Sequence, residues 1–426
     1  MKVLVVGGGA REHALVARFS HELAEGAVLC APGNPGIARI ARTADVEASD
    51  LEGLLNLARR ESIDLTIVGP ELPLSLGIVD AFKKEGRLIL GPTAAAARLE
   101  SSKAFAKAFM ARHRVPTARF EVFNSAEAAL AFVRERAFGW PLVLKADGLA
   151  AGKGVVIAAT LEEAERAVTA AMSEHRFGSA GDCLVIEECL SGPEVSFFVL
   201  SDGTRALPLG TAQDHKRIFD NDRGPNTGGM GAFAPSPLVD QALSDRIMRE
   251  IVDPVIAGMA AEGTPFHGFL YVGLMLTDNG PKVIEFNVRF GDPEAQVVLP
   301  LVDEPLLPIF LDAARGTLRR ERIRVSSDTL VGVVLASRGY PESSESGQPI
   351  AGMDAAERLG ARVMHAGTKR QGDQVVTAGG RVLTVIGRGP TYAAAIAQAY
   401  SGVECISFSG MQYRRDIGKS ALAAIK

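Results

Sequence analysis

The sequence has few of the features that mark disulfide-bonded, zinc-binding or nucleic-acid-binding proteins. Its 426 residues include only four cysteines, none of them in a C-x-x-C pair, so neither a disulfide framework nor a zinc knuckle is expected. The 46 lysines and arginines are offset by 50 aspartates and glutamates, for a net charge of -4. Without a basic surplus there is no broad positive field for a nucleic-acid backbone, so we expect no nucleic-acid partner.

Long apolar runs are also absent. The first one spans only Val3 to Val6 and is followed by three glycines, which is too short for a signal-peptide core or a membrane span. Together with the scattered cysteines, this predicts a cytoplasmic protein that acts away from membranes. Hydrophobic residues nevertheless make up 47% of the chain, enough for sizeable cores, and the length favours about three domains.

The first hundred residues alternate between strand-like and helix-like segments. Apolar runs KVLVV, AVLCA, DLTIV and RLIL are separated by stretches such as REHALVARFS and LEGLLNLARR. This alternation predicts an open, mainly parallel sheet with helices on its faces. A helix is expected from Ser101 to His113, and a new unit begins after Val115-Pro116.

The middle of the chain predicts a small α+β unit followed by an antiparallel sheet. In the first, Asn124 with Glu127 and Thr160 with Glu163 have the spacing of capping boxes at the start of two helices. In the second, the expected strands are EVSFFVL, GFLYVGLML and KVIEFNV. The Gly/Pro/Asn-rich stretch 220–237 is expected to be a long functional loop.

The carboxy-terminal part opens with TLVGVVLAS and contains a predicted hairpin, in which QVVT and RVLTVIG are joined by residues 378–380. A domain boundary is placed near Arg324. The predicted fold class is α/β and α+β multidomain, with an amino-terminal open parallel α/β domain, a two-part core and a small carboxy-terminal α+β domain. The expected boundaries are 1–100, a connecting helix over 101–116, the two core parts 117–190 and 191–324, and 325–426.

A glycine-rich segment between two strands is the first candidate for nucleotide chemistry. Lys145 ends a strand, and the loop that follows carries Gly152, Lys153 and Gly154. Glycines let backbone N–H groups approach phosphate oxygens, and lysines neutralise the charge. The spacing is not that of a Walker loop, because Gly154 stands where Ser or Thr would follow the lysine. A flexible hairpin turn with solvated lysines is the alternative.

Three acids follow at the end of a later apolar strand. Glu187 and Glu188 close the strand CLVIEECL, and Glu194 follows after Leu190-Ser-Gly-Pro. Such a strand end can offer backbone groups to an adenine edge, while a nearby carboxylate accepts the ribose hydroxyls. Ordinary surface acids at a strand terminus would look the same, so the pattern leaves both interpretations open.

A polar face on the strand KVIEFNV is the candidate metal site. Alternation places Glu285, Asn287 and Arg289 on one side and Phe286 and Val288 on the other. A carboxylate and an amide oxygen are hard ligands suited to Mg²⁺ that bridges nucleotide phosphates. Arg289 has a planar fork that can hold a carboxylate or an acyl phosphate. The alternative is a half-exposed strand with a polar outer face.

The loop Gly7 to Gly9 joins the first strand to a helix, where phosphate is the favoured guest of the helix N-terminus. A nicotinamide dinucleotide is the competing guest. However, Glu12 replaces the packing glycine of that fingerprint, and the second strand ends in Cys30-Ala-Pro-Gly without a ribose-binding acid. Glu71 follows the strand DLTIV and is placed to accept ribose hydroxyls or a reacting amine, or simply to cap a helix.

A charged cluster, Asp214-His-Lys-Arg217, precedes the glycine-rich run Asn226 to Met230. A solvated turn is one interpretation of the cluster. Because the glycine-rich run follows it, we favour a substrate-closing lid, since lids need such hinges. His215 is a candidate proton carrier, but no histidine is assigned as the base.

In chain order, a set of these residues resembles the ATP-grasp ligases: Lys103, Lys145 with its glycine loop, Glu187 and Glu188, Glu194, and Glu285-x-Asn287-x-Arg289. Longer motifs are similar to the glycinamide ribonucleotide synthetase family and cover nearly the whole chain. These motifs are G-G-x-R-E-H at 8–13, A-P-G-N-P-G at 31–36, V-G-P-E at 68–71, K-A-D-G-L-A-A-G-K-G at 145–154, Q-D-H-K-R at 213–217, G-P-N-T-G-G-M-G-A at 224–232 and R-F-G-D-P-E at 289–294.

The resemblance implies a ligase that uses ATP as co-substrate and Mg²⁺ or Mn²⁺ as cofactor. The carboxylate of glycine would attack the γ-phosphorus of ATP to give glycyl phosphate and ADP. The amine of phosphoribosylamine would then displace phosphate, giving glycinamide ribonucleotide for purine synthesis. The implied partners are glycine, phosphoribosylamine and ATP, bound by a monomer. Segment 117–190 would be the small ATP-grasp subdomain, acting as a lid, and 191–324 the large subdomain with the metal site.

The resemblance also implies a role for each site residue. ATP would be bound by Lys103, Lys145, Gly152, Lys153, Gly154, Glu187, Glu188 and Glu194. The other substrates would be bound by Gly8, Gly9, Arg11, Glu12, Gly33, Asn34, Glu71, His215, Arg217, Asn226, Thr227, Gly228, Gly229 and Asp292. The metal would be held by Glu285 and Asn287, and the catalytic residues would be Arg289, Asp214 and Lys216.

Two other functions remain open. Another ATP-grasp ligase, such as a carboxyaminoimidazole-type enzyme, would use a different carboxylate and amine, although the motifs at 213–217 and 224–232 disfavour it. A non-catalytic ATP-binding regulator would not need Glu285, Asn287 and Arg289 together. One departure from the ATP-grasp pattern is that 271–275 carries no acid, so the ligands of a second metal stay unassigned.

Overall fold

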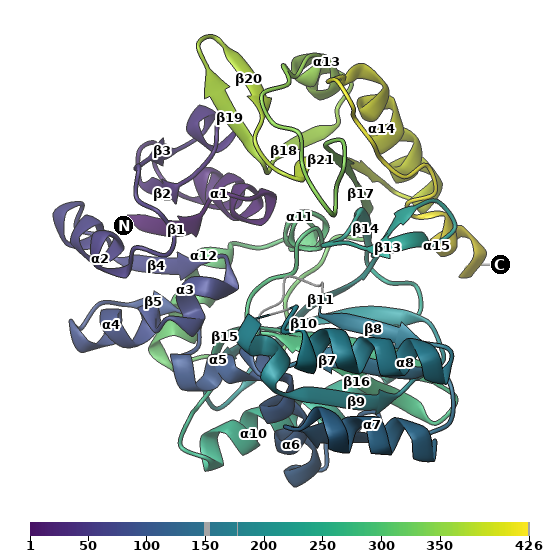
Figure 1. Cartoon of the computed structure of the whole chain (residues 1–426). Helices are drawn as coiled ribbons and strands as arrows, with labels where there is room; N and C mark the ends of the chain where they lie inside the picture. Colours follow the sequence, from purple (N-terminus) through teal and green to yellow (C-terminus); the bar gives the residue numbers. More distant parts are fainter. Residues whose placement is uncertain (149–153, 177, 425–426) are drawn as a thin grey trace.

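The computed structural model describes residues 1–148, 154–176 and 178–424. Segment 149–153, which holds Gly152 and Lys153 of the expected phosphate loop, lies outside the described residues. Figure 1 shows the amino-terminal sheet on the left, the carboxy-terminal segment above it and a four-stranded unit below. No helix of the described residues is both long and apolar enough to cross a membrane.

The amino-terminal unit is a five-stranded parallel sheet in the order β3-β2-β1-β4-β5. Its elements are β1 (Val3–Gly7), α1 (Ala10–Glu22), β2 (Val28–Pro32), β3 (Arg42–Thr43), α2 (Leu51–Arg60), β4 (Leu65–Val68), α3 (Glu71–Ser75), α4 (Ile78–Lys84) and β5 (Ile89–Leu90). Because successive side chains of a strand point to opposite faces, Val3 and Val5 pack with α1, while Leu4 and Val6 pack with α2 and α4. The predicted open parallel sheet is confirmed.

Two helices, and not one, connect this unit to the rest of the chain. Helix α5 (Ala94–Ser101) ends just before Ser102, and α6 (Lys103–Arg112) begins after it. Ser102 has an extended backbone, and its hydroxyl accepts a hydrogen bond from the Phe105 amide at 3.1 Å. A serine in this position satisfies an otherwise free amide of the first turn. The helix expected from Ser101 therefore begins at Lys103.

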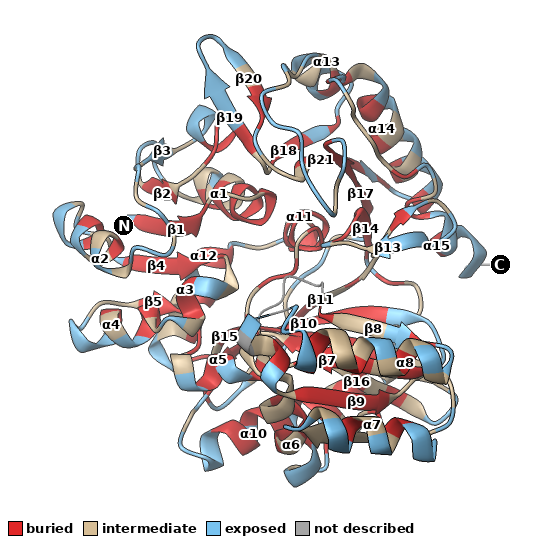
Figure 2. Cartoon of the chain, viewed as in Figure 1, coloured by how far each residue is buried: buried red, intermediate tan, exposed pale blue. Residues whose placement is uncertain are grey.

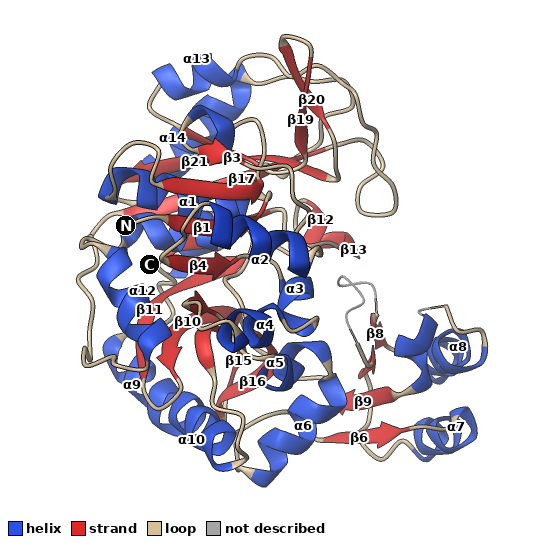
Figure 3. Cartoon of the chain, turned by 90° about the vertical axis from the view of Figure 1, so that its left-hand side faces the viewer, coloured by secondary structure: helices blue, strands red, loops and turns tan. Residues whose placement is uncertain are grey.

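The next unit is a four-stranded antiparallel sheet in the order β6-β9-β7-β8, with helices α7 and α8. Its elements are β6 (Phe120–Phe123), α7 (Ala126–Glu135), β7 (Leu142–Ala146), β8 (Val155–Ala158), α8 (Leu161–Val168) and β9 (Leu184–Glu188). Figure 3 shows this unit extending from the body of the protein. The cap of α7 is Ser125, not the expected Asn124. Thr160 caps α8 as expected, but Glu163 accepts from the Ala159 amide and not from that of Thr160.

The largest sheet has eight antiparallel strands in the order β16-β15-β10-β11-β14-β17-β21-β18. The strands are β10 (Glu194–Asp202), β11 (Ala206–Asp214), β14 (Gly231–Ala234), β15 (His267–Thr277), β16 (Gly280–Asn287), β17 (Thr329–Ala336), β18 (Arg362–His365) and β21 (Arg381–Gly389). Helices that follow the strands are α9 (Gln241–Ile247), α10 (Asp253–Ala261), α11 (Ala295–Val298) and α12 (Leu306–Arg315). Strands β14 and β17, in the middle of the sheet, are buried along their whole length (Figure 2).

This sheet does not stop at the boundary expected near Arg324. Strand β14 pairs with β17, with Gly231 opposite Val333 and Phe233 opposite Val331. The pairing also corrects the long loop expected over 220–237, because that stretch contains β14 and the short strand β13 (Arg223–Asn226), which pairs with β12 (Arg217–Phe219). The carboxy-terminal strands thus continue the sheet of the core.

The expected carboxy-terminal hairpin is wrong, because its two strands do not pair with each other. Strand β20 (Gln374–Thr377) pairs with β19 (Thr368–Gln371), and β21 pairs with β17 and β18. Residues 378–380 therefore connect two different sheets. Helices α13 (Met353–Arg358), α14 (Tyr392–Cys405) and α15 (Lys419–Ala424) complete this part of the fold.

Candidate active site

Charged side chains gather where β10 begins and where β11 and β16 end. The ammonium of Lys216 lies 2.8 Å from Glu194 Oε2 and 3.9 Å from Glu285 Oε1. Burial by itself would lower the pKa of Lys216, but the carboxylates of Asp214, Glu194 and Glu285 outweigh it and raise the pKa well above its ordinary value. Lys216 is therefore a permanently charged group that links two strands.

Burial raises the pKa of two further carboxyl groups of this cluster. Burial raises the pKa of Asp214 to about 7, an effect that Lys216 opposes and Glu294 reinforces. Burial also raises the pKa of Glu294, which accepts a hydrogen bond from the Ser196 hydroxyl at 3.2 Å. Glu294 was missed as a site residue, although it ends the motif R-F-G-D-P-E. It supplies an acid near the stretch 271–275, which carries none.

The polar face of β16 is arranged as expected. Phe286 and Val288 are buried, and Glu285, Asn287 and Arg289 point the other way. The Glu285 side chain is 40% exposed. Burial would raise its pKa, but Lys216, Lys145 and Lys103 together lower it, so the carboxylate is ionised.

These donors fit a magnesium ion. Mg²⁺ is commonly bound by one or two protein oxygens, with water and substrate phosphates as its other ligands. Among the described residues no group of three or more His, Cys, Asp or Glu side chains is arranged to enclose a metal. An ionised, half-exposed Glu285 beside the Asn287 amide matches a site in which the protein supplies few ligands and water and phosphates supply the others. With its amide nitrogen turned toward Glu100, Asn287 would donate to Glu100 Oε1 at 3.0 Å.

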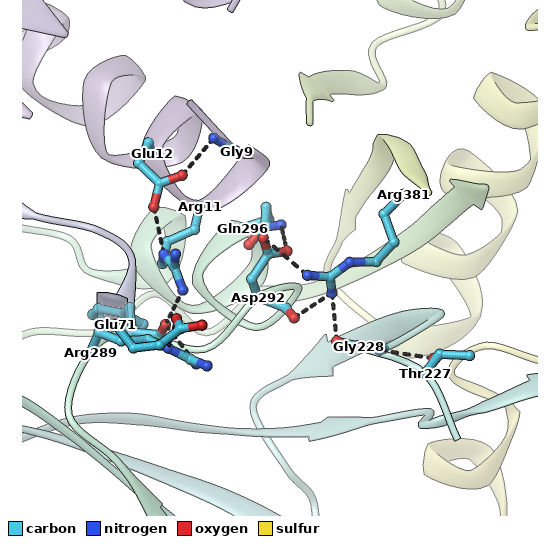
Figure 4. Close-up of polar contacts among 12 residues, drawn as sticks. Gly9, Arg11, Glu12, Glu71, Thr227, Gly228, Arg289, Asp292, Gln296 and Arg381 are labelled. Carbon is cyan, nitrogen blue, oxygen red and sulfur yellow. Dashed lines mark hydrogen bonds and ion pairs between the residues drawn. The ribbon is translucent and has the colours of Figure 1, made fainter. Parts of the chain in front are cut away.

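Arg289 is held between two acids from the amino-terminal part of the chain. Its Nε lies 3.2 Å from Glu71 Oε2, and a terminal nitrogen lies 3.2 Å from Glu100 Oε1 (Figure 4 shows Glu71 beside Arg289). Burial would lower the pKa of Arg289, but the two carboxylates outweigh it and raise the pKa. The structure thus brings the expected catalytic arginine to Glu71 of the expected amine pocket. Glu100 was not expected at the site.

Glu187 is part of a buried network of two lysines. Lys145 Nζ lies 2.9 Å from Glu187 Oε1 and donates to the Ile284 carbonyl at 3.1 Å. Lys107 Nζ lies 2.7 Å from Glu187 Oε2 and donates to Thr117 Oγ1 at 2.7 Å. Burial lowers the pKa of Lys107 to about 8, although Glu187 opposes that shift. The Glu187 carboxylate therefore holds Lys145 and Lys107 in place, and its Oε1 accepts no hydrogen bond among the described residues.

The other residues expected to bind ATP lie around this network. Lys103 Nζ donates to the Gly148 carbonyl at 2.8 Å, and burial lowers the pKa of this lysine. Glu188 is paired with Arg119 at 2.7 Å and lies 3.4 Å from Lys282. Gly154 is buried just before β8, whereas Gly152 and Lys153 fall in the undescribed segment.

The amino-terminal glycine loop is closed by Glu12. Its Oε2 accepts a hydrogen bond from the Gly9 amide at 2.6 Å, and its Oε1 lies 2.6 Å from Arg11 Nε. A Cβ added at Gly69 would lie only 1.9 Å from Glu12 Oε1, so this glycine makes room for the carboxylate. Glu12 was expected to bind substrate, but the structure uses both of its oxygens to hold the loop and Arg11. Figure 4 shows these contacts at the start of α1.

Gly33 and Asn34 support the same loop from the side. A Cβ at Gly8 would lie 2.6 Å from the Gly33 carbonyl oxygen. The Asn34 amide donates to the carbonyls of Gly8 and His365, both at 2.9 Å, and its oxygen accepts from the Ile37 amide at 2.9 Å. Asn34 is therefore a connection between the loop and the carboxy-terminal strand β18, and its side chain has little capacity left for substrate.

The region expected to be a hinged lid is fixed in the large sheet. The His215 amide donates to the Gly231 carbonyl at 2.9 Å, and the Met230 amide donates to the His215 carbonyl at 2.8 Å. Met230 is completely buried. Burial and the nearby Arg414 lower the pKa of His215 to about 4, so it is neutral at pH 7. In this structure the run is therefore held against the sheet, and His215 is uncharged at pH 7.

The glycine-rich run is held by side chains from three directions. The Thr227 hydroxyl donates to the Lys216 carbonyl at 2.8 Å and accepts from the Gly229 amide at 3.0 Å. Arg381, from β21, donates to the Gly228 carbonyl at 2.5 Å. Asn226 and Arg217 face each other across β12 and β13, and Arg217 donates to the Gly224 carbonyl at 2.7 Å. Arg381 was missed, because no sequence pattern ties it to this run.

The site residues therefore form two groups that meet on β16 and the segment after it. The group around Glu285 contains Lys103, Lys145, Glu194, Asp214, Lys216 and Glu294. The group around Arg289 contains Arg11, Glu71, Glu100, Asp292 and Arg381. The first has the cations and hard oxygens that nucleotide phosphates need, and the second adjoins the glycine loop at the start of α1.

The chain matches three family models along its length. They are described as the N domain of phosphoribosylglycinamide synthetase at residues 1–100, its ATP-grasp (A) domain at 101–295 and its C domain at 330–420. A phosphoribosylamine–glycine ligase of Xylella fastidiosa is 50% identical over 99% of this chain and 98% of its own length. The ligase of that name from Vibrio cholerae is 48% identical over 99% of both chains.

Solved structures give the same result. The crystal structure of phosphoribosylamine–glycine ligase from Thermotoga maritima matches 98% of this chain and 100% of its own, with a TM-score of 0.84 and 34% identity. A biotin carboxylase from Campylobacter jejuni in complex with an ATP analogue matches with a TM-score of 0.72 at 17% identity. At that identity the second likeness concerns the fold alone.

Proposed function

Because the chain belongs to the phosphoribosylglycinamide synthetase family, we propose that it joins glycine to 5-phosphoribosylamine with ATP, giving glycinamide ribonucleotide, ADP and phosphate. One observation carries the proposal: Glu285 of the phosphate-binding group and Arg289 of the amine-side group lie four residues apart and point the same way. The end of β16 therefore lies between the proposed nucleotide site and the proposed amine site. An acyl phosphate formed at the first site can react with the amine at the second.

The group around Glu285 would bind ATP. Lys145 and Lys103 contribute positive charge, and Glu187 with Lys107 keeps Lys145 in position. Glu285 and Asn287 would hold Mg²⁺, or Mn²⁺ in its place, which would neutralise charge on the phosphates. Lys216 stays charged between Glu194 and Glu285 and would stabilise the transferring phosphoryl group, with Asp214 supporting that charge.

The reaction has two steps. The glycine carboxylate attacks the γ-phosphorus, and ADP leaves, because a free carboxylate has no leaving group suitable for amide formation. The amine of phosphoribosylamine then attacks the carbonyl of glycyl phosphate, and phosphate leaves. Arg289 would orient the glycyl carboxylate and its phosphate, since its guanidinium is planar and is held in place by Glu71 and Glu100.

The group around Arg289 would bind phosphoribosylamine. The amides of Gly8 and Gly9, at the start of α1, favour a phosphate, and Arg11 adds charge beside them. Glu71 would contact the ribose hydroxyls or the amine. Gly228 and Gly229 would let the backbone approach glycine closely, with Arg381 and Asp292 fixing the run from the far side.

The remaining expectations belong to the same proposal. The segment 117–190 would act as the lid over ATP, and the enzyme would work as a cytoplasmic monomer on small molecules only. The test is ADP release that requires both glycine and phosphoribosylamine. A different ATP-grasp ligase would release ADP with another carboxylate, and a non-catalytic binder would release none.

A further inference from the structure

A cavity separate from the two substrate groups lies at the far end of α1. It is enclosed by α1, the residues after α11, the segment before β17, and the strands β18 and β21, and its volume is about 430 Å³. Small-molecule sites typically have roughly 300 to 1,000 Å³. A second cavity of about 250 Å³ shares Arg362 and Arg388 with it. The glycine loop lies at the start of α1, whereas the cavity is lined by residues from Ala14 to Glu22 of that helix, so the two sites occupy different parts of it.

The cavity has an apolar side and a basic side. Its apolar lining comes from Ala14, Ala17, Leu299, Pro300 and Met364. Its basic lining comes from Arg18, Arg324, Arg362 and Arg388, together with His21. A ligand that fits both sides has an apolar body and a negatively charged group.

Two of the three acids in the lining are already engaged. Glu22 accepts hydrogen bonds from the first amides of α12, those of Leu306 and Leu307, both at 2.9 Å, and pairs with Arg18 at 2.7 Å. Glu304 pairs with Arg320 and accepts from the Arg324 amide at 2.6 Å. Asp303 is the one acid of the lining that forms no ion pair among the described residues.

Two of the four arginines, both of them exposed, have no ion-pair partner among the described residues. Arg18 pairs with Glu22, and Arg388 lies 2.7 Å from Asp328. For the guanidinium groups of Arg324 and Arg362, the described part of the chain provides neither a salt bridge nor a hydrogen bond. These two unpaired cations line the same cavity.

Arg362 and Arg388 carry like charges close together on the sheet. Arg362 lies opposite Ile386, and Arg388 is two residues further along β21, so both guanidinium groups lie on one face of the sheet. Long side chains at such diagonal positions can reach each other, so the two like charges repel. Although both side chains are exposed, partial burial and the charges of Arg388 and Arg18 lower the pKa of Arg362. A bound dianion would remove this repulsion.

We propose that this cavity binds a small organic phosphate, with the phosphate between Arg324, Arg362 and Arg388 and an apolar or aromatic body against Leu299 and Met364. A phosphate is favoured over a carboxylate because its charge of nearly two matches the two unpaired guanidinium groups. The site is separate from those of the proposed reaction, and nothing in its argument depends on that reaction.

The test uses phenyl phosphate as the probe and calorimetry on the full-length protein. We expect saturable binding to the unmodified protein, and binding weakened about tenfold or more in Arg362→Ala and Arg324→Ala. The matched control is Arg358→Ala, which removes an exposed arginine of α13 that lines neither cavity. Inorganic phosphate and phenol should each bind more weakly than phenyl phosphate, since the first has no aromatic ring and the second has no phosphate. No saturable binding, or equal binding by all variants, would overturn the proposal.

Thermal unfolding supplies a second readout that does not depend on the heat of binding. Because the Arg362 guanidinium has no described partner, Arg362→Ala should unfold at no lower temperature than the unmodified protein. Phenyl phosphate should raise the midpoint of the unmodified protein and of Arg358→Ala, but not that of Arg362→Ala. An equal rise in all three would place the probe elsewhere, for example on the glycine loop, and would contradict the proposal. Neither measurement uses catalysis, so a failure here leaves the proposed function untouched.

Discussion

Arg381 and Asp292 are joined twice although they are 89 residues apart: the guanidinium donates to the Asp292 carbonyl at 2.6 Å and lies 3.4 Å from the Asp292 carboxylate. The same guanidinium donates to the Gly228 carbonyl at 2.5 Å (Figure 4). Arg381 belongs to β21, which is in the carboxy-terminal part of the chain. The carboxy-terminal part of the chain is therefore a structural component of the site.

We expect Arg381→Met to damage both catalysis and stability. The change leaves two backbone carbonyls without their charged donor, which costs on the order of 1.5 to 3 kcal/mol for each hydrogen bond lost. The glycine-rich run would then lose its fixed position, so kcat/KM for glycine should fall about tenfold or more. Arg370→Met, at an exposed position of β19, is the control. Unchanged glycine kinetics in Arg381→Met would show that the run is positioned without it.

Lys107→Met should impair the use of ATP, although Lys107 itself need not touch the nucleotide. Without Lys107, the Glu187 carboxylate has Lys145 as its one remaining cation in the network, so Lys145 should be drawn toward Glu187 and away from phosphate. We expect the KM for ATP to rise about tenfold with little change in the KM for glycine.

The stability of Lys107→Met should fall by about 3 to 5 kcal/mol, as is typical when one partner of a buried ion pair is removed. Kinetics are therefore compared on protein shown to be folded by its thermal midpoint. Lys84→Met, at an exposed position of α4, is the matched control. An ATP dependence in Lys107→Met equal to that of the control would mean that Lys145 needs no such support.

The strand pattern could be predicted because its cause is local. Alternation along β16 follows from the pleat alone, so Glu285 and Asn287 share a face in any sheet, and Arg289 follows two residues after the strand ends. The same holds for the parallel strands of the amino-terminal unit, whose apolar runs and glycine-rich turns are continuous in sequence. The helix break at Ser102 was missed because apolar and basic residues continue across it without a glycine or proline.

Other parts of the site depend on contacts that no local pattern contains. Arg381 reaches Gly228 only because β14 pairs with β17, which brings β21 into the same sheet. Lys107 sits in the helix KAFAKAFMAR, where a lysine normally faces solvent, and only the packing of α6 against β9 buries it beside Glu187. Glu12 is a related case, because a helix-capping acid and a substrate-binding acid look alike in sequence.

Glu285→Gln and Arg289→Lys should have different effects although both residues lie on one face. Glu285→Gln removes charge from the expected Mg²⁺ site, so turnover should fall on the order of 10²-fold and the magnesium requirement should rise. Arg289→Lys keeps the charge but cannot contact Glu71 and Glu100 with a planar fork. It should raise the KM for glycine and leave the magnesium dependence unchanged.

These two variants are compared in magnesium titrations of initial rate, with Glu342→Gln at an exposed position as the control. Near-normal turnover of Glu285→Gln at ordinary magnesium concentrations would refute the metal site. A raised magnesium requirement in Arg289→Lys would mean that the two groups are not functionally separate.

The buried pair His13 and His365 should make stability depend on pH. The His365 amide donates to His13 Nδ1 at 2.9 Å, and the two rings lie 5.7 Å apart. Burial, with the neighbouring His365 and Arg39, lowers the pKa of His13 to about 3; burial and Arg39 lower that of His365 to about 4. Both are therefore neutral in the folded protein at pH 5, whereas the unfolded chain takes up protons below about pH 6.5.

Stability from this pair is present above pH 6.5 and is lost as the pH falls toward 4. By pH 5 the loss should be about 2 kcal/mol for each histidine. Denaturant unfolding at pH 7 and pH 5 measures it, and His13→Asn combined with His365→Asn should reduce the difference. His175→Asn, at an exposed position, should not. An equal pH dependence in both variants would assign the acid sensitivity to other groups.

The most direct test of the proposed function is ADP release by the purified protein, followed with each component omitted in turn. The account predicts steady release only when ATP, Mg²⁺, glycine and phosphoribosylamine are all present, with glycinamide ribonucleotide formed in equal amount. Release that continues without glycine, or that depends on a different carboxylate, would contradict the account.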